Sequence, residues 1–402
     1  MKPRVLVTGA SGFVGSRLIE VLEQRSDWQI RALVHRPSSG VRLSHLKVET
    51  LCGDICDPEF VARAMQDVDA VVHLAYQNQP TRAGQSNATV QGTRVLATNA
   101  RQMGVSHFVH ISTLGVFSYR PRGPIEESAK LHLCGDAYCD DKIRAERWVS
   151  KVWKDESGYT ILRFANVYGP YSPPWVIRIL NYLKTGRPVR VGDGQQAFSL
   201  LYVDNAVQGI LAALQKPPRN AVYHLCDAIP SVSTYMETLA SWLPDTRPLV
   251  LPLESYRKLN SWRSKTKVEL TELRTFLIAP ETKVWLFRLL EFPLLLQRML
   301  WVLNHLPAGL RQTLRSKILG MSKKRKLPDS GTGPQPTDVS GAWDGRLFID
   351  AGLYHLLASN VRFESTKAQQ ELGFCPVVSL QEGLELTRQW CEWAGLLETP
   401  RQ

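Results

Sequence analysis

Patterns typical of disulfide-bonded, zinc-binding and membrane-spanning proteins are missing from this sequence. Its seven cysteines are an odd number and form no CxxC pair, so we expect reduced thiols and predict no metal site. No apolar run approaches the roughly 18 uncharged residues that a membrane-spanning helix requires. The first residues, Met-Lys-Pro-Arg-Val-Leu-Val-Thr-Gly, lack the pattern of a secretory signal. These absences predict a cytoplasmic protein that is not exported.

Acidic residues are scarce in one segment, which carries most of the net charge of +12. Residues 283–326 contain ten Lys or Arg and one acid, and the rest of the chain is close to neutral. No RNA- or DNA-binding module is recognisable around this segment, so we predict no nucleic-acid partner. Its Trp-, Phe- and Leu-rich stretches, with Lys323–Lys326, suit peripheral contact with the inner, anionic face of a membrane. A helical cap on a substrate pocket explains the same pattern, and the two interpretations are compatible.

Short β-branched runs alternate with helical patterns in the amino-terminal part of the chain. Residues 58–66 and 90–103 have helical patterns. Such alternation predicts right-handed βαβ crossovers and a mostly parallel α/β sheet, whose ligands bind beyond the carboxyl ends of the strands. The runs that we predict to be strands are 4–8, 29–34, 48–52, 70–74, 107–112 and 160–164.

A glycine-rich turn follows the first predicted strand. It reads Thr8-Gly9-Ala10-Ser11-Gly12-Phe13-Val14-Gly15 and opens a helical pattern. Glycine allows tight curvature and the close approach of a pyrophosphate, which then lies at the helix N-terminus with its free N–H groups. The alternative is a tight strand-to-helix turn without a ligand. Because other motifs accompany the turn, we favour dinucleotide binding.

The end of the second predicted strand has no acidic residue. The chain reads Arg31-Ala32-Leu33-Val34-His35-Arg36-Pro37 there, whereas a fold that selects NAD usually has an acid for the ribose 2′-hydroxyl. A guanidinium suits a 2′-phosphate, because it can bind it through two hydrogen bonds. We therefore expect His35 and Arg36 to contact the cofactor and NADP(H) to be preferred, with NAD(H) still open. The alternative is that Arg36 is an ordinary exposed charge.

Tyr138 and Lys142 lie four residues apart in a helical pattern. This spacing places the phenol and the ammonium on one helix face. A nearby cation stabilises a phenolate and lowers the pKa of the tyrosine, as a proton donor to a carbonyl requires. A Tyr/Lys pair at this spacing is usually incidental when it stands alone, so its meaning depends on the surrounding motifs.

Together, these motifs resemble those of the extended short-chain dehydrogenase/reductase family, the NAD-dependent epimerase/dehydratase group. The resemblance covers roughly residues 3–245 and 360–393. In chain order, the sequence matches the family's TGxxGxxG at 8–15, its acidic adenine contact at Gly53-Asp54-Ile55, its HLA motif at His73-Leu74-Ala75, its catalytic strand at 110–117, its YxxxK at 138–142 and its RxxNxYGP segment at 163–170.

The resemblance implies a role for each matched residue. Tyr138 acts as acid/base, Lys142 lowers its pKa and binds the nicotinamide ribose, and Thr113, where the family usually has serine, orients the substrate oxygen. Hydride moves between the nicotinamide and the carbon that bears this oxygen. The neighbouring Ser112 points to the opposite face of its strand and is expected to be structural. The expected cofactor-binding residues are Thr8, Gly9, Ser11, Gly12, Phe13, Val14, Gly15, His35, Arg36, Asp54, Ile55, Leu74, Ala75, Tyr138 and Lys142.

Two departures from the family pattern bear on the substrate. In Gly192–Phe198, which resembles the family's GDGxQxR segment, Phe198 replaces the arginine that usually pairs with a sugar-nucleotide diphosphate. A phenyl ring cannot pair with a phosphate. Thr89 stands where the family normally has asparagine. We predict Asn166 and Phe198 as substrate-binding residues and leave Thr89 out of the site.

The resemblance also implies the architecture, a Rossmann-type doubly wound parallel sheet with a smaller C-terminal substrate lobe that carries a helical insertion. The predicted parts are a dinucleotide-binding domain at 1–170 with its core continuing into 198–228, a substrate lobe at 171–260 and 346–402, an apolar and basic helical insertion at 261–326, and a flexible loop at 327–345.

We interpret the chain as an NADP(H)-preferring oxidoreductase that acts on a ketone or secondary alcohol of a steroid-, terpenoid- or polyketide-like molecule. This is similar to the 3β-hydroxysteroid and sterol dehydrogenase branch of the family. One alternative is a nucleotide-sugar epimerase or dehydratase, against which Phe198 argues. Another is a cofactor-binding protein without turnover, against which Thr113, Tyr138 and Lys142 argue. A homodimer is compatible with the sequence.

Overall fold

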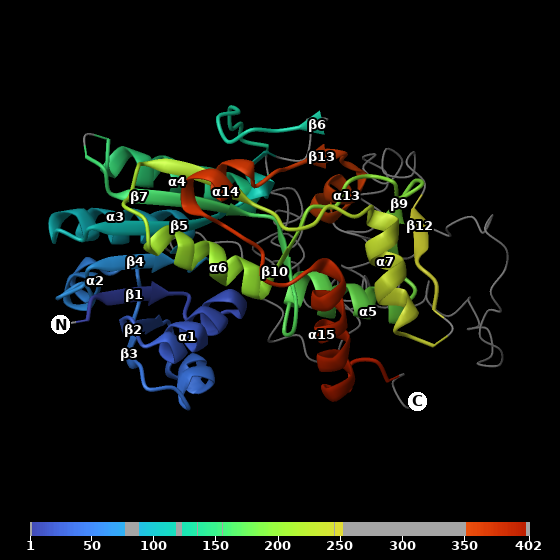
Figure 1. Ribbon diagram of the computed structural model, residues 1–402, viewed down its shortest axis with the longest axis horizontal. Helices are drawn as coiled ribbons and strands as arrows, with labels where there is room; N and C mark the ends of the chain where they lie inside the picture. Colours follow the sequence, from blue (N-terminus) through green and yellow to red (C-terminus); the bar gives the residue numbers. More distant parts are fainter. Residues whose placement is uncertain are drawn as a thin grey trace, which may run out of the picture. The chain divides into compact units, whose positions relative to one another are not determined.

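A parallel sheet of seven strands forms the centre of the part of the chain that the structure describes (Figure 1). In the computed structural model this part comprises residues 2–76, 88–117, 123–134, 136–154, 156–244, 246–251 and 351–398. In sheet order, the strands are β11 (Ala221–Leu225), β7 (Tyr159–Phe164), β5 (His107–Thr113), β4 (Ala70–His73), β1 (Arg4–Thr8), β2 (Gln29–Val34) and β3 (Glu49–Cys52).

The six strands predicted from the sequence are confirmed, each within one residue at either end. Their β-branched and aliphatic residues suit a sheet that is covered on both faces, because such strands bury side chains in both directions. All residues of β4, β5 and β7 except Thr113 are buried. The sheet gains β11, which the sequence reading did not single out as a strand. The predicted Rossmann-type α/β class is confirmed.

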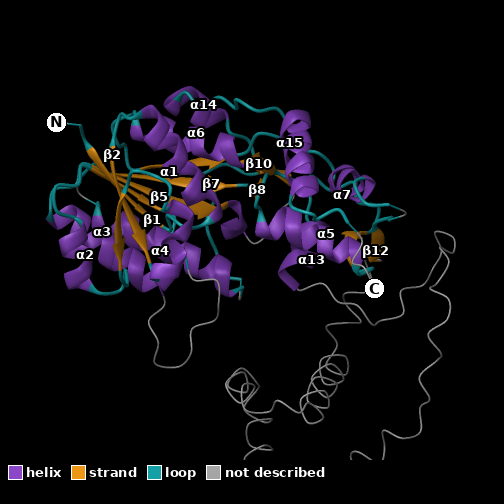
Figure 2. Cartoon of the chain, turned by 90° about the horizontal axis from the view of Figure 1, so that it is seen from below, coloured by secondary structure: helices purple, strands orange, loops and turns teal. Residues whose placement is uncertain are grey.

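Helices cover both faces of the sheet (Figure 2). The apolar side chains of the helices on each face join a separate buried cluster with the strands. One face carries α1 (Phe13–Arg25), α6 (Val203–Leu214) and α14 (Thr366–Leu372). The other face carries α2 (Pro58–Ala64), α3 (Thr93–Gln102) and α4 (Ala137–Val152). The predicted helices at 58–66 and 90–103 correspond to α2 and α3, although a short π-helical turn at Ala88–Gly92 precedes α3.

A smaller group of elements lies beyond the carboxyl ends of the sheet strands, on the right of Figure 1. Its helices are α5 (Arg178–Lys184), α7 (Val232–Ser241), α13 (Ala351–Ala358) and α15 (Leu380–Trp393). Three two-stranded parallel sheets pair β8 (Asn166–Tyr168) with β10 (Leu200–Tyr202), β9 (Pro188–Val191) with β12 (Leu249–Leu251), and β6 (Gly123–Pro124) with β13 (Val361–Arg362). The smaller C-terminal lobe is therefore present, and it combines segments from both sides of residues 252–350.

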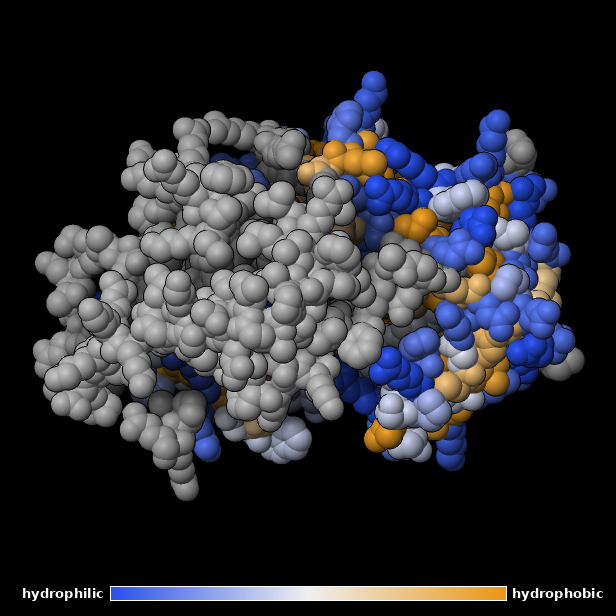
Figure 3. All heavy atoms as spheres, turned by 180° about the vertical axis from the view of Figure 1, so that it is seen from behind, coloured by the Kyte–Doolittle hydropathy of each residue, from blue (hydrophilic) through white to orange (hydrophobic). Residues whose placement is uncertain are grey.

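The predicted helical insertion at 261–326 and the predicted loop at 327–345 lie outside the described residues. All described residues belong to one compact unit, formed by residues 1–253 and 345–402. In this part of the chain, no helix combines the length and the apolar character that a membrane span needs. The described surface in Figure 3 is largely hydrophilic, with small hydrophobic areas between the polar ones.

The strand order places a switch point beside β1. The chain runs from β1 outward to β2 and β3 on one side and to β4, β5 and β7 on the other. In open sheets of this kind, the crevice for a ligand lies at the carboxyl ends of the strands where the order reverses. Thr8 and His73, which end β1 and β4, are paired in the register at this point.

Candidate active site

The turn between β1 and α1 has no room for a side chain at two of its glycines. Gly9 has a φ of +68°, and a Cβ atom there would lie 2.7 Å from the backbone nitrogen of Ala75. A Cβ at Gly15 would lie 2.2 Å from the carbonyl oxygen of Gly9. The turn therefore packs backbone against backbone, as expected where the chain must approach a ligand closely.

Helix α1 begins without a side chain that could cap it. Gly12 occupies the N-cap position, and the first turn of the helix contains no acidic residue. In α2, by contrast, the Asp57 carboxylate accepts a hydrogen bond from a backbone N–H at the helix start. The predicted residues Ser11, Phe13 and Val14 lie in the glycine turn and at the start of α1. Free N–H groups at the positive end of a helix dipole fit a pyrophosphate, so the turn fits the predicted dinucleotide.

The remaining predicted cofactor contacts lie directly after three strands at the same edge of the sheet. Arg36 is exposed to solvent. Asp54 is also exposed, and one of its carboxylate oxygens accepts a hydrogen bond from the backbone of Cys56 at 2.8 Å. In chain order, these residues are His35 and Arg36 after β2, Asp54 and Ile55 after β3, and Leu74 and Ala75 after β4.

A buried histidine connects the glycine turn to α3. His73 Nδ1 lies 2.6 Å from Thr8 Oγ1, and its Nε2 lies 2.8 Å from Thr93 Oγ1. The Thr93 hydroxyl donates to the carbonyl oxygen of Thr89, so it accepts from Nε2–H, and Nδ1 accepts from the Thr8 hydroxyl. Burial lowers the pKa of His73 to about 3, with a smaller contribution from Lys142. His73 is therefore neutral and holds the ends of β1 and β4 in register.

The predicted catalytic residues meet where β5 ends and α4 begins. Lys142 is buried, and its Nζ donates a hydrogen bond to the carbonyl oxygen of Ile111 at 2.8 Å. Thr113 Oγ1 accepts a hydrogen bond from the backbone of Gly115 at 3.1 Å, which leaves its hydroxyl proton able to reach another oxygen. The Thr113 side chain also lies near the Tyr138 phenol and acts to lower its pKa. The structure thus brings Thr113, Tyr138 and Lys142 together.

A buried carboxylate supports this group from behind. Glu146 accepts hydrogen bonds from the Ser112 hydroxyl at 2.5 Å and from Arg163 Nη2 at 2.8 Å. Both members of the Glu146–Arg163 ion pair are nearly fully buried. Burial lowers the pKa of Lys142 to about 8, and the Glu146 carboxylate acts in the opposite direction. Ser112 therefore joins a structural network that links β5, β7 and α4.

Tyr138 is more exposed to solvent than Lys142. Although 44% of the residue is exposed, desolvation of the phenol and the nearby Tyr76 raise its pKa, while hydrogen bonding to Thr113 lowers it. The expected lowering of the Tyr138 pKa by Lys142 remains a prediction.

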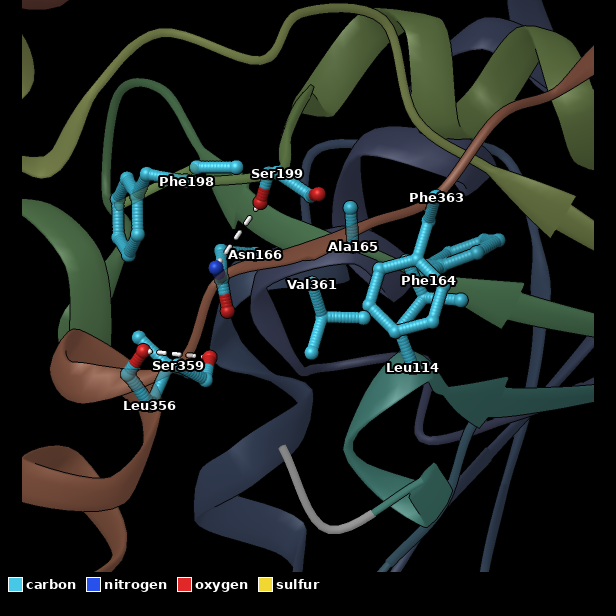
Figure 4. A pocket seen from close by; sticks show the side chains of 11 residues that line it. Leu114, Phe164, Ala165, Asn166, Phe198, Ser199, Leu356, Ser359, Val361 and Phe363 are labelled. Atoms are coloured by element: carbon cyan, nitrogen blue, oxygen red, sulfur yellow. Dashed lines mark hydrogen bonds between the residues drawn. The ribbon is translucent and has the colours of Figure 1, made fainter. Parts of the chain in front are cut away.

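A small cavity beside Thr113 is lined by four segments that are far apart in the sequence (Figure 4). Eight of its eleven lining residues are apolar. Asn166 contributes one polar group, and its side-chain amide donates to the carbonyl oxygen of Ser199 at 2.9 Å. The lining residues are Leu114 after β5, Phe164–Asn166 at the end of β7, Ala197–Ser199 before β10, and Leu356, Ser359, Val361 and Phe363 from α13 and β13.

Phe198 lies at one end of this cavity, opposite Phe164 and Phe363 (Figure 4). Its side chain is almost completely buried, and its ring contacts those of Trp175 and Tyr235, with centroids 5.5 and 5.2 Å away. The ring is therefore packed into the smaller lobe as well as facing the predicted substrate site.

A family model described as the NAD dependent epimerase/dehydratase family matches residues 5–226. The chain belongs to this family. The matched segment contains the glycine turn, the Tyr138/Lys142 pair and Asn166, so the resemblance stated from the sequence is confirmed. The protein is accordingly an enzyme of the extended short-chain dehydrogenase/reductase type.

Curated relatives in this family carry out different reactions. Human dTDP-D-glucose 4,6-dehydratase is 28% identical over 242 residues, which cover 55% of this chain and 68% of that one. A ketoreductase for 4-hydroxy-2-methyl-3-oxo-4-farnesyl-3,4-dihydroquinoline-1-oxide, from Stigmatella aurantiaca, is 28% identical over 56% of this chain and 69% of that one. Sterol demethylase protein B of Methylococcus capsulatus is 34% identical over 61% of this chain and 77% of that one.

Solved structures share the fold over most of the chain. UDP-glucose 4-epimerase from Thermotoga maritima, in a structure with UDP-glucose, has a TM-score of 0.63 and 20% sequence identity. The match covers 97% of this chain and 99% of the epimerase. This likeness supports the doubly wound sheet with its smaller lobe.

Two residues of the site, Glu146 and Tyr76, escaped the sequence reading. Glu146 follows Lys142 by four residues, so the helical spacing could have indicated it. The contact of Glu146 with Arg163 and the position of Tyr76 beside Tyr138 depend on neighbouring strands. No local sequence pattern predicts such contacts.

Proposed function

We propose that this enzyme is an NADP(H)-preferring oxidoreductase that acts on a ketone or secondary alcohol of a lipophilic molecule. A bound nicotinamide dinucleotide supplies or accepts the hydride. The glycine turn and the N-terminus of α1 hold its pyrophosphate, and Arg36 binds the 2′-phosphate. Asp54, Ile55, Leu74 and Ala75 complete its binding site along the sheet edge.

In the direction of reduction, the protein's own groups handle the substrate oxygen. Thr113 donates its hydroxyl proton in a hydrogen bond to the substrate oxygen and so orients this oxygen. Tyr138 transfers its phenolic proton to the oxygen as negative charge develops there. Lys142 stabilises the resulting phenolate, because an ammonium nearby favours the charged form of a tyrosine.

The replacement of the family's arginine by Phe198 carries the proposal of a lipophilic substrate, and the largely apolar lining of the small cavity beside Thr113 is consistent with it. A sugar nucleotide brings two phosphate charges, which are costly to bury without cationic partners. Phe198 stands where the family has its arginine, and its ring is packed between Trp175 and Tyr235. Arg190, in the same lobe, is paired with Glu237 at 2.9 Å. The sterol and farnesyl-quinoline relatives are consistent with this substrate class.

The similarity to dTDP-D-glucose 4,6-dehydratase favours a second candidate, a nucleotide-sugar epimerase or dehydratase. Two measurements separate the candidates. In the first, the purified enzyme is assayed for NADPH oxidation with a panel of steroid, terpenoid and polyketide-like ketones. In the second, binding of UDP- and GDP-sugars is measured by calorimetry. We expect ketone reduction, and sugar-nucleotide affinities no better than about millimolar.

The Tyr138→Phe variant is the control for the chemistry. It keeps the ring but removes the proton donor, so NADPH should still bind while ketone reduction falls by roughly 10²–10⁴-fold. Turnover within a few-fold of the unaltered enzyme would reject the role of Tyr138. Micromolar affinity for a UDP-sugar, with no ketone reduced, would favour the epimerase or dehydratase.

A further inference from the structure

Tyr76 lies against both members of the Tyr138/Lys142 pair, although no motif assigns it a role. It follows the His73-Leu74-Ala75 segment at the carboxyl end of β4. Its ring meets the Tyr138 ring edge-on, with centroids 5.7 Å apart and an interplanar angle of 69°. The Lys142 Nζ lies 5.7 Å from the centroid of the same ring. Tyr76 thus forms a T-shaped pair with the Tyr138 ring and presents the face of its own ring to the ammonium.

The surroundings of Lys142 leave its charge incompletely compensated. The lysine is 3% exposed, and an ammonium has three N–H donors. Among the described residues, its nitrogen has a hydrogen bond to Ile111. Glu146, on the same helix, is the nearby carboxylate that favours the charged form, but it is shared with Arg163.

In the described part of the chain, two histidines near Lys142 supply no negative charge. His73 on β4 and His110 on β5 are both fully buried, and burial keeps the pKa of each well below 6.5, so both are neutral. Lys142 also lies over the ring of Tyr76, whose aromatic face attracts a cation through its quadrupole. Such contacts count for more where the cation is desolvated, as Lys142 is.

We propose that Tyr76 is a positioning residue of the active site, whose ring stabilises the charged form of Lys142 and fixes the orientation of the Tyr138 phenol. The inference rests on the proposed roles of Tyr138 and Lys142. The proposal depends on the ring of Tyr76 and not on its hydroxyl, since both interactions involve the aromatic ring.

The consequence is a shift in the pH at which Lys142 loses its proton. Burial already lowers the pKa of Lys142 to about 8, so the lysine is charged below this pH and becomes neutral as the pH rises through it. Removing the aromatic face removes stabilisation from the charged form alone. The pKa of Lys142 should then fall further, by about 0.5–1 unit for a contact of this kind.

Tyr76→Leu and Tyr76→Phe form a matched pair of variants. Leucine keeps an apolar side chain but removes the ring, whereas phenylalanine keeps the ring and removes the hydroxyl. The pKa of Lys142 is measured by NMR titration of the enzyme with ¹³Cε-labelled lysine, and Lys142→Met identifies its signal. We expect the Leu variant to titrate about 0.5–1 unit lower than the unaltered enzyme and the Phe variant to titrate with it.

A kinetic measurement tests the same inference in turnover. The basic limb of kcat/KM for ketone reduction, at saturating NADPH, should shift downward in Tyr76→Leu by the same amount. At pH values above this limb, activity should be about 3–10-fold lower than in the unaltered enzyme, with the Phe variant unchanged. Tyr76 is half-exposed, so both variants are expected to fold, and circular dichroism checks this.

The two measurements can fail separately. An unchanged or raised pKa of Lys142 in Tyr76→Leu would overturn the role of Tyr76, as would an equal shift in both variants. If the unaltered enzyme reduces no ketone, the proposed function fails, while the titration still decides whether the ring of Tyr76 holds the charge on Lys142.

Discussion

We propose that the choice between NADPH and NADH depends on Arg36. It is exposed directly after β2, and the stretch around it contains no acid that would favour a free 2′-hydroxyl. A guanidinium that pairs with a phosphate contributes about 1.5–3 kcal/mol, as hydrogen bonds to charged groups do. Arg36→Ala should therefore weaken NADPH binding by roughly 10- to 150-fold and leave NADH binding nearly unchanged.

Fluorescence titration of both dinucleotides measures this difference. Arg42→Ala, which removes another arginine in the loop after β2, is the control and should change neither affinity by more than about twofold. Tighter binding of NADH than of NADPH to the unaltered enzyme would show that His35 and Arg36 do not select the cofactor.

Single residues differ in how far the sequence predicts their surroundings. Tyr138 and Lys142 were predictable as a pair, because helix geometry fixes a spacing of four residues. The tautomer of His73 depends on its hydrogen bonds to Thr8 and Thr93, which reach it from two other elements. Sequence alone gives no distance between such elements, so the hydrogen-bonded chain through His73 became visible only in the structure.

The start of α4 determines where Tyr138 stands. The Asp136 carboxylate caps this helix by accepting a hydrogen bond from the backbone N–H of Cys139 at 2.9 Å. Tyr138 lies within the first turn of α4, so fraying of this turn would displace its phenol. Asp136→Ala should lower the free energy of unfolding by about 1 kcal/mol, as the loss of an N-cap usually does. It should also lower kcat several-fold.

Asp57→Ala is the matched control, because Asp57 caps α2 through the backbone N–H of Glu59 at 2.9 Å. That helix carries none of the proposed catalytic residues. Both variants should lose similar stability in urea titrations, but only the Asp136 variant should lose turnover. Asp136→Asn keeps a capping oxygen, so its turnover should be close to that of the unaltered enzyme. Equal turnover in both alanine variants would contradict the link between the cap and the phenol.

Among the secondary-structure elements, the sequence best predicted those that have a clear local pattern of apolar and β-branched residues. The strands of the large sheet were found within one residue, because their β-branched runs are bounded by turns and helices. The two-residue strands β6 and β13 pair with each other across most of the chain. Such short strands have no pattern of their own, since they exist only through their partner.

For the whole molecule, the motifs and their order predicted the doubly wound sheet and the family. The cavity beside Thr113 was harder to predict, because residues in and next to α13 and β13 line it beside residues at the end of β7. These segments are far apart in the sequence, and the predicted insertion separates them. Phe198 shows the same limit. The sequence showed that phenylalanine replaces the family's arginine there, but it could not show that the ring contacts Trp175.

The basic segment 283–326 is the remaining large feature of the chain, and we propose that it binds anionic membrane surfaces. The segment contains ten Lys or Arg and one acid. Each Lys or Arg contributes about 1 kcal/mol of binding free energy near an anionic leaflet. Such binding would bring the enzyme to the membrane, where a lipophilic substrate dissolves. The protein should float with vesicles that contain anionic lipid at low salt. It should remain unbound with neutral vesicles.

Salt and charge removal test this attraction on the intact chain. At about 1 M salt the screening length falls to roughly 3 Å, so vesicle binding should be lost. Replacing Lys323, Lys324, Arg325 and Lys326 with glutamine removes four of the charges and should weaken binding at low salt by 10²-fold or more, at about 1 kcal/mol per residue. Ketone reduction in solution should stay unchanged in this variant, because the membrane interpretation places these residues away from the substrate. If the unaltered protein stays with the unbound fraction at low salt, or if the glutamine variant loses solution activity instead of vesicle binding, the segment acts as a cap on the substrate site.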